Sequence, residues 1–410
     1  MAHPPRRSWS DGLPPELVAI ILLQLNCLAD RVCFEAVCRA WRSAASFVDG
    51  LRRGVPWLLL PSRDAPSFFS LHSGATRRLN LPEGVRGARL CGAHDGGWVA
   101  VAADPWRGFS AVNLLSGARV AFPEKLSLEL PYSHTYGFQY AAGHHHMLIR
   151  TIAFSAPPSS ESCVAAAHVS SSSNIAFWKQ GMSRHWVASR SEPDVIQDMI
   201  YHRGELLEGF HVLTNREEVR VYAPLGGSRG PNAPLEIICT TYPMHRRADY
   251  QPDNALPPTF IATRYLAESR GRLLMVLRHY TGNRVGRRTH MFRIFEMRPG
   301  SPAYSQPQHG ATATEGSWVE LPELSGRALF LGRGCSRVVE VAQFDMLQEG
   351  TIYYLDDANL DLSMVLNNGS SSYRNTDMGI FRKGEKISTG ARQFPLEFTA
   401  DCSPPLWLVP

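Results

Sequence analysis

The sequence FSLHSGATRRLNLPE at residues 69–83 is followed by a second version of itself, AVNLLSGARVAFPE, at residues 111–124. Each copy has a short apolar run, a Ser-Gly turn and a second apolar run that stops at a proline. The glycines of the two turns are 43 residues apart and the prolines are 41 residues apart. A period of about 40–50 residues made of short strands is that of a β-propeller blade.

The chain beyond Gly50 continues this pattern, because its short apolar runs are broken by Gly, Pro, Ser and Asp. Trp186 and Trp318 are each followed by a valine and lie 132 residues apart, which equals three periods of 44. Roughly 355 residues remain after the amino-terminal segment, enough for six or seven blades. Further strands are predicted at 164–169, 205–213, 219–223, 273–278, 291–297, 328–332, 351–355 and 379–382.

Length and composition agree with a closed, repetitive fold. A chain of 410 residues exceeds an ordinary single core unless the fold closes on itself or repeats. The 33 glycines and 29 prolines favour turns over long helices, so a mainly β protein is expected. The net charge of +5 is too dilute for a phosphate-binding surface, and no nucleic-acid partner is predicted.

The cysteines and the apolar runs indicate a compartment. The eight cysteines include no Cys-x-x-Cys pair, which fits a reducing environment. The longest apolar run near the amino terminus, Leu17 to Leu23, has seven residues, whereas about 20 are needed to span a bilayer. We therefore expect a soluble intracellular protein of the cytoplasm or nucleus, with no membrane partner.

Helical periodicity is confined to the stretch from Leu13 to Phe47. Apolar residues recur there at spacings of three and four, and two prolines can occupy the first helical turn. A second segment can begin at Asp30, and a third carries Cys38 and Trp41 on one stripe. Three short helices are therefore predicted. A unit this small buries little surface and needs a partner or a neighbouring domain.

The motifs of this helical segment resemble an F-box. LPPEL at residues 13–17 and VCRAWR at residues 37–42 stand in the order and at the spacing of that family. The resemblance implies that the segment binds a Skp-type adaptor and, through it, the cullin and RING subunits of a ubiquitin ligase. It also implies an adaptor-facing or supporting surface formed by Leu13, Pro14, Leu17, Ile20, Ile21, Val37, Cys38 and Trp41. Leu17 and Ile21 can equally be internal packing residues.

The rest of the chain resembles the KIB-type β-propeller that follows the F-box in a large family of plant proteins. The motifs that carry this likeness are GAHDGGW (92–98), NLLSG (113–117), DMIYHRG (198–204), ALFLGRGCS (328–336), IYYLDD (352–357) and DMGIF (377–381). Leu115 departs from the proline of many relatives, and 226–256 and 299–316 read as insertions. The expected organisation is an F-box at 8–50 and a propeller at 55–405.

No motif of the sequence predicts catalysis. A nucleophile elbow, a P-loop and a zinc-protease helix are all absent from the sequence. His144, His145 and His146 are consecutive, so on a strand they point to alternate faces, and no metal or other cofactor is predicted. Arg333 and Arg337 are candidates for a rim that binds a target.

The expected function is that of a non-catalytic substrate receptor: the F-box holds the adaptor and the propeller binds an unknown target protein. Two alternatives stay open. The chain can be a small-ligand-binding or enzymatic propeller with a structural helical prefix, or a receptor that only sequesters its partner.

Overall fold

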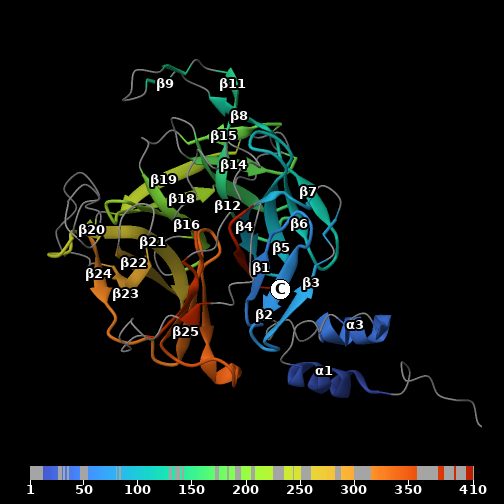
Figure 1. Cartoon of the computed structure of the whole chain (residues 1–410). Helices are drawn as coiled ribbons and strands as arrows, with labels where there is room; N and C mark the ends of the chain where they lie inside the picture. Colours follow the sequence, from blue (N-terminus) through green and yellow to red (C-terminus); the bar gives the residue numbers. More distant parts are fainter. Residues whose placement is uncertain are drawn as a thin grey trace, which may run out of the picture.

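The computed structural model of the chain describes a mainly β protein with a small helical unit (Figure 1). The residues that it describes are 13–25, 30, 33–34, 37–46, 54–79, 81–82, 85–128, 132–133, 139–140, 143–170, 175–181, 184–189, 195–204, 208–224, 235–242, 244–250, 260–281, 288–299, 315–357, 377–382, 392–393 and 403–409.

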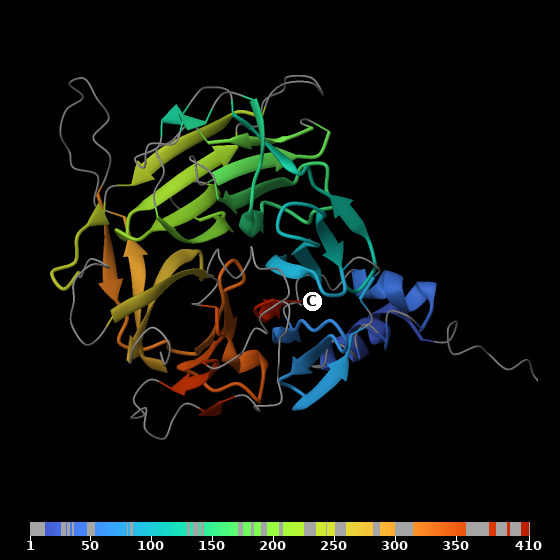
Figure 2. The same ribbon diagram turned by 45° about the horizontal axis from the view of Figure 1, so that its top comes forward.

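Within these residues, six sheets of four to six strands surround a central axis, so the predicted propeller is confirmed with six blades (Figure 2). Blade 1 contains β1 (Trp57–Leu60), β2 (Ser67–Ser70), β3 (Ala75–Arg78) and β30 (Leu406–Leu408). Blade 2 contains β4 (Arg89–His94), β5 (Trp98–Ala102), β6 (Phe109–Asn113) and β7 (Arg119–Ala121). The two quoted repeats fall in these blades, at β2–β3 and β6–β7.

Blades 3 and 4 form the next part of the ring. Blade 3 contains β8 (Lys125–Leu128), β11 (Gly143–His146), β12 (Ile149–Phe154), β13 (Val164–Val169), β14 (Ile175–Lys179) and β15 (Trp186–Ala188). A separate hairpin pairs β9 (Tyr132–Ser133) with β10 (Gln139–Tyr140). Blade 4 contains β16 (Ile196–His202), β17 (Gly209–Thr214), β18 (Val219–Pro224) and β19 (Ile237–Tyr242).

Blades 5 and 6 complete the ring. Blade 5 contains β20 (Met244–His245), β21 (Phe260–Ser269), β22 (Arg272–Thr281), β23 (Arg288–Arg298) and β24 (Gly316–Glu320). Blade 6 contains β25 (Arg327–Leu331), β26 (Arg337–Glu340), β27 (Thr351–Tyr354), β28 (Gly379–Arg382) and β29 (Arg392–Gln393), with a 3-10 helix, η3 (Val341–Gln343), after β26. Trp186 and Trp318 therefore lie two blades apart, not three, because blades 4 and 5 are longer than the predicted period.

The ring is closed by the end of the chain. β30 pairs antiparallel with β1, so that Trp57 lies opposite Leu408, and it supplies the inner strand of blade 1. This strand lies beyond the expected propeller boundary at residue 405. The other inner strands are β4, β12, β16, β21 and β26, which contact their neighbours around the axis.

The core lies between the blades. Side chains alternate along a strand, so one face of each blade packs on the blade before it and the other on the blade after it. In β5, Val99 and Val101 belong to the apolar cluster shared with blades 1 and 6, whereas Trp98, Ala100 and Ala102 belong to the cluster shared with blade 3. Both faces of such strands must be apolar, which explains their uninterrupted apolar runs.

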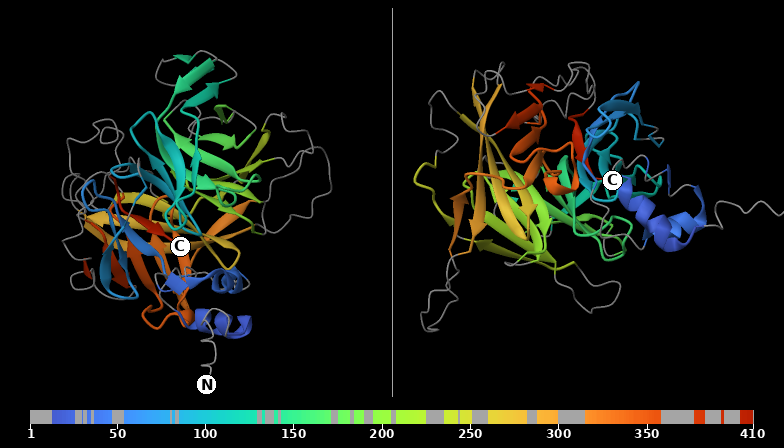
Figure 3. Two further views of the ribbon diagram at one scale, coloured as in Figure 1. Left: turned by 90° about the vertical axis from the view of Figure 1, so that its right-hand side faces the viewer. Right: turned by 90° about the horizontal axis from the view of Figure 1, so that it is seen from below.

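The helical unit contains α1 (Pro15–Gln24) and α3 (Arg39–Ser46), which lie outside the ring beside blade 1 (Figure 3). Three helices were predicted, and only these two are described in full. The predicted second helix, which begins at Asp30, falls in the interval between them, where the structure describes residues 30, 33–34 and 37–38 alone. No helix of the described residues is long and apolar enough to cross a membrane.

Candidate functional site

The inner face of α1 forms the small core of the helical unit. Val18 and Leu22 are buried against Phe34 and Ala44, and Leu13, Leu25 and Trp41 pack around them. All of these residues belong to the helical unit itself, so none of this cluster is supplied by the propeller.

The helical unit also carries large apolar side chains that are exposed, three of them on α1. Leu17 is 47% exposed, Ile20 53%, Ile21 39% and Val37, just before α3, 59%. We call these four residues the outer helical face. Pro14 is also exposed. A short helix with apolar residues on both sides is typical of an element that is covered twice, once by its own unit and once by a partner.

The remaining predicted adaptor residues support this face from within. The Trp41 ring packs on Phe34 with 4.3 Å between ring centroids, and the Trp41 backbone N–H donates to Cys38 Sγ at 3.5 Å. Trp41 Nε1 is buried and has no hydrogen-bond partner in the described structure. Leu13 is half-buried on the same core. The structure thus divides the predicted set into exposed residues, namely Pro14 and the outer helical face, and supporting ones, namely Leu13, Cys38 and Trp41.

A second candidate site lies in the propeller, at the carboxyl ends of the inner strands. A cavity of about 490 Å³ is lined there by later residues of β4, β12, β16 and β21, by the whole of β26, and by residues near these strands and near β1 and β30. This volume falls in the range of about 300–1,000 Å³ usual for ligand pockets. We call it the axial cavity.

The loop Gly332–Ser336 links several blades beside the axial cavity, which Gly334 and Ser336 line. The Gly334 N–H donates to Asp198 Oδ1 of blade 4 at 3.0 Å, and the Arg333 N–H donates to Asp357 Oδ2 of blade 6 at 2.7 Å. Gly334 has φ +67°, and a Cβ there would contact Thr151 of blade 3 at 3.5 Å. We call this loop the channel loop; its positive φ at Gly334 favours glycine.

Asp198 fixes the channel loop to two blades. Besides Gly334, its carboxylate accepts hydrogen bonds from the N–H groups of Met199 and Leu266, each at 2.9 Å. Burial raises the pKa of Asp198 to about 7, although these N–H donors and Arg333 favour the charged form. The residue is structural, since all three bonds hold backbone.

Charged residues of both signs surround the mouth of the axial cavity. Arg337 binds Asp95 through Nε and Nη2, each at 2.8 Å from Oδ1, and the Arg270 Nη2 lies 2.7 Å from Glu340 Oε2. His202 Nδ1 lies 3.2 Å from Glu268 Oε2. Burial opposes the charge of Arg337, but its pairing with Asp95 raises the Arg337 pKa. Each of these carboxylates thus has an arginine or histidine nitrogen within 3.2 Å.

His94 adds a neutral polar group to the wall. Its ring packs edge-on against Phe154, with 6.1 Å between centroids. Burial lowers the pKa of His94 to about 4; nearby Asp95 opposes this shift, and Arg337 and Arg203 add to it. The imidazole is therefore uncharged at neutral pH and can both donate and accept a hydrogen bond.

Only one of the two predicted rim arginines lines the axial cavity. Arg337 does, whereas Arg333 is absent from the lining, and its charge acts on His168 of blade 3. Only three residues lie between the two arginines, but the channel loop turns there. Sequence reasoning missed Asp95, Arg203 and Arg270, each of which precedes a glycine turn at the end of an inner strand: HDGG (94–97), HRG (202–204) and SRG (269–271).

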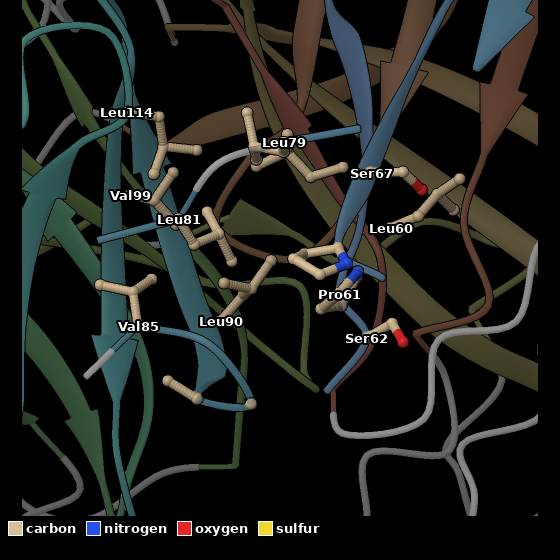
Figure 4. A pocket seen from close by; sticks show the side chains of 14 residues that line it. Leu60, Pro61, Ser62, Ser67, Leu79, Leu81, Val85, Leu90, Val99 and Leu114 are labelled. Carbon is tan, nitrogen blue, oxygen red and sulfur yellow. The ribbon is translucent and has the colours of Figure 1, made fainter. Parts of the chain in front are cut away.

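A further hollow between blades 1 and 2 is too small to bind a ligand. It is lined by leucine, valine and proline side chains that face one another, including Leu60, Leu81 and Leu90 (Figure 4). Its volume of about 20 Å³ holds little more than one water molecule. This gap belongs to the packing of the blades.

The described residues contain no group of three or more His, Cys, Asp or Glu side chains placed to hold a metal ion. Among models of known protein families, the one described as the KIB1-4 beta-propeller matches residues 68–382. No curated protein matches the chain.

Proposed function

The chain belongs to the KIB1-4 beta-propeller family, and from that premise we propose that it is the substrate receptor of an SCF-type ubiquitin ligase. The outer helical face binds a Skp-family adaptor, which links the chain to cullin and RING subunits. The propeller binds the target protein. Such a receptor works in the cytoplasm or nucleus. The observation that carries the proposal is the exposure of four apolar side chains on a unit whose described residues also form a buried apolar cluster of their own.

The exposed side chains are large enough to drive association. Complete burial of a leucine, isoleucine or valine side chain contributes about 1.5–3 kcal/mol, and the residues of the outer helical face are each roughly half exposed. Together with Pro14 they form the apolar anchors of a helix-in-groove contact. The resemblance of the surrounding residues to an F-box supports a Skp-type adaptor as this partner.

The receptor acts by position. It holds adaptor and target on one chain, so that ubiquitin transfer to the target proceeds at high effective concentration. The chain itself supplies no nucleophile in this proposal, because the described carboxylates at the cavity mouth are each paired with arginine or histidine. Gly54, the first described residue after the helical unit, lines the axial cavity.

Adaptor binding by the purified full-length chain tests this proposal. Ile20→Asp should weaken the affinity for a recombinant Skp-type adaptor by about tenfold or more, since binding would bury an unpaired charge. Ile238→Asp is the matched control, because Ile238 is 48% exposed on β19, far from the helices. Trp41→Ala should also reduce adaptor binding by removing the support beneath the face. Equal adaptor affinity in wild type, Ile20→Asp and Trp41→Ala would refute the assignment.

A second candidate function is favoured by the axial cavity itself. A polar cavity of about 490 Å³ suits a small ligand, as expected of a ligand-binding or enzymatic propeller with a structural helical prefix. That function requires no adaptor, so absence of adaptor binding by the wild-type chain would favour it. A receptor that only sequesters its target would bind adaptor or target yet support no ubiquitination in a reconstituted ligase.

A further inference from the structure

We propose that the axial cavity is the docking site for the target, and that it takes an exposed loop or chain end with an apolar residue flanked by charges of both signs. The inference rests on the proposed receptor function and names the class of segment that the receptor recognises. It is carried by the order of charges at the mouth, the character of the interior and the exposure of the rim ion pairs.

The charges alternate in sign around the mouth. From blade 2 to blade 6, the charged lining residues are Asp95, Arg203, Glu268, Arg270, Glu340 and Arg337, and Arg337 returns to Asp95 through their ion pair. Three negative and three positive groups leave the lining without net charge. A polyanion would meet as many carboxylates as guanidinium groups, so a nucleic acid or a phosphate cluster is disfavoured. A target segment with charges of both signs can pair with both the carboxylates and the guanidinium groups.

The inside of the cavity has a different character from its mouth. Ala93, Ala153, Met199 and Phe154 supply apolar wall, and Gly334 presents bare backbone. An apolar side chain fits this interior, since burying it releases water from both surfaces. The channel loop contacts blades 3, 4 and 6 beside the cavity, so we expect an occupant that enters and leaves by the mouth, such as a loop that turns back or a chain end.

The ion pairs at the rim are exposed, so a charged residue of the target can replace one partner in each pair. The side chains of Arg203 and Glu208, which lie 3.1 Å apart, are 66% and 59% exposed, and Arg270 and Glu340 are also exposed by more than 40%. Exposed pairs of this kind contribute only about 0–1 kcal/mol, so a target's charged residues can replace one partner at small cost. The buried pairs elsewhere in the propeller lack this freedom.

A random peptide library displayed on phage and panned against the purified full-length chain tests the proposal. Enriched peptides should carry an apolar residue flanked by both acidic and basic residues. Individual peptides are then made and their affinities measured.

Two variants test whether the peptides bind in the axial cavity. Gln343→Trp is designed to block the mouth, because Gln343 is exposed and lines the cavity. Gln348→Trp is its control, since Gln348 is exposed on the same blade away from the lining. Arg203→Glu breaks the alternation of charge, and Arg78→Glu, exposed on the outer strand of blade 1, is its control.

We expect Gln343→Trp and Arg203→Glu each to weaken peptide binding by about tenfold or more, with both controls near wild type. The variant Ile20→Asp should bind the peptides normally while losing the adaptor, which separates a failure of the docking site from a failure of the receptor role. The inference is overturned if peptide affinity is unchanged by both mouth variants, if the enriched peptides carry charge of one sign only, or if no peptide is enriched.

Discussion

In the helical unit, the apolar residues Leu17, Ile20 and Ile21 lie exposed, whereas in the propeller the arginines Arg264 and Arg278 are almost completely buried. The buried arginines have their partners within the chain. Arg264 Nε lies 3.3 Å from Glu217 Oε1, and Arg278 Nη2 lies 3.0 Å from Asp377 Oδ2. Among the described residues, the exposed apolar side chains of the helical unit lie outside its buried cluster. The comparison therefore sets charged groups that are paired inside the propeller against apolar groups that are left open on the helices, and the proposed adaptor would cover the latter.

Trp407→Ala tests whether the propeller is closed by its own last strand, and should give the largest effect. Trp407 on β30 is buried, packs edge-on against Phe330 and donates from Nε1 to Leu331 O at 3.1 Å. Its truncation should lower the free energy of unfolding by about 3–5 kcal/mol, with about 1 more for the hydrogen bond. Urea denaturation of the full-length chain measures the loss. Trp106→Ala is the control, since Trp106 is 41% exposed; equal losses in the two variants would contradict closure by β30.

The buried charges offer the next test. Arg278 also donates to Thr289 Oγ1 at 2.8 Å and to the Tyr265 hydroxyl at 3.1 Å, and pairing raises its pKa despite burial. Arg278→Leu leaves Asp377 buried without this partner and should lower the free energy of unfolding by about 3–5 kcal/mol. Arg272→Leu, on the same strand but in a half-exposed pair with Glu296, should lower it by at most about 1 kcal/mol. A small loss for Arg278→Leu would show that the network is not structural.

The substitution Asp198→Asn tests whether this buried carboxyl group stabilises the propeller, because its effect on the free energy of unfolding should depend on pH. An asparagine has only one carboxamide oxygen, so its NH₂ group would face the Leu266 N–H and neither would have an acceptor there. We therefore expect the free energy of unfolding to fall by about 1.5–3 kcal/mol. Since burial raises the pKa of Asp198 to about 7, above about 3.9 in the unfolded chain, its contribution to stability is full at low pH and is lost as pH rises to 7 and above.

The difference in unfolding free energy between wild type and Asp198→Asn should therefore shrink from pH 5 to pH 8. Urea titrations at unit pH intervals measure it. A difference that instead grows with pH would mean that the three N–H donors outweigh burial and keep the pKa of Asp198 low.

Strands packed on both faces were the easiest feature to predict. The predicted strands 164–169 and 379–382 coincide with β13 and β28, and 219–223 with all but the last residue of β18. β13 is buried along its whole length, whereas β18 and β28 combine buried and half-buried positions, and most of the buried positions in the three strands are apolar. By contrast, β30 is flanked by prolines and has only three residues, and it pairs with β1 from the other end of the chain. The local sequence pattern cannot predict a strand pairing between residues so far apart in the chain.

The axial cavity could not be predicted because its residues come from strands that are distant in sequence. The charged residue before a glycine, as at Asp95, Arg203 and Arg270, was a usable signal once the inner strands were known. The period was also misleading, since the insertions that lengthen blades 4 and 5 shift Trp318 by a whole blade relative to Trp186. The sequence motifs predicted the residues of the outer helical face. The spacing of the apolar residues could not show which of them lie on the exposed side of α1 and which on its buried side.

The smallest expected effect is that of Ile20→Ala, compared with Leu22→Ala two residues away on α1. Ile20 points outward and Leu22 is buried on Phe34 and Ala44. In the free chain, Ile20→Ala should change the opening free energy of α1 by no more than about 0.5 kcal/mol, whereas Leu22→Ala should lower it by about 2–5 kcal/mol. Amide hydrogen exchange in α1 of the full-length chain measures both. Because the two residues share one helix and similar volume, an equal effect in the free chain would mean that the outer face is already covered, and the distinction between paired charges in the propeller and open apolar groups on the helices would be lost.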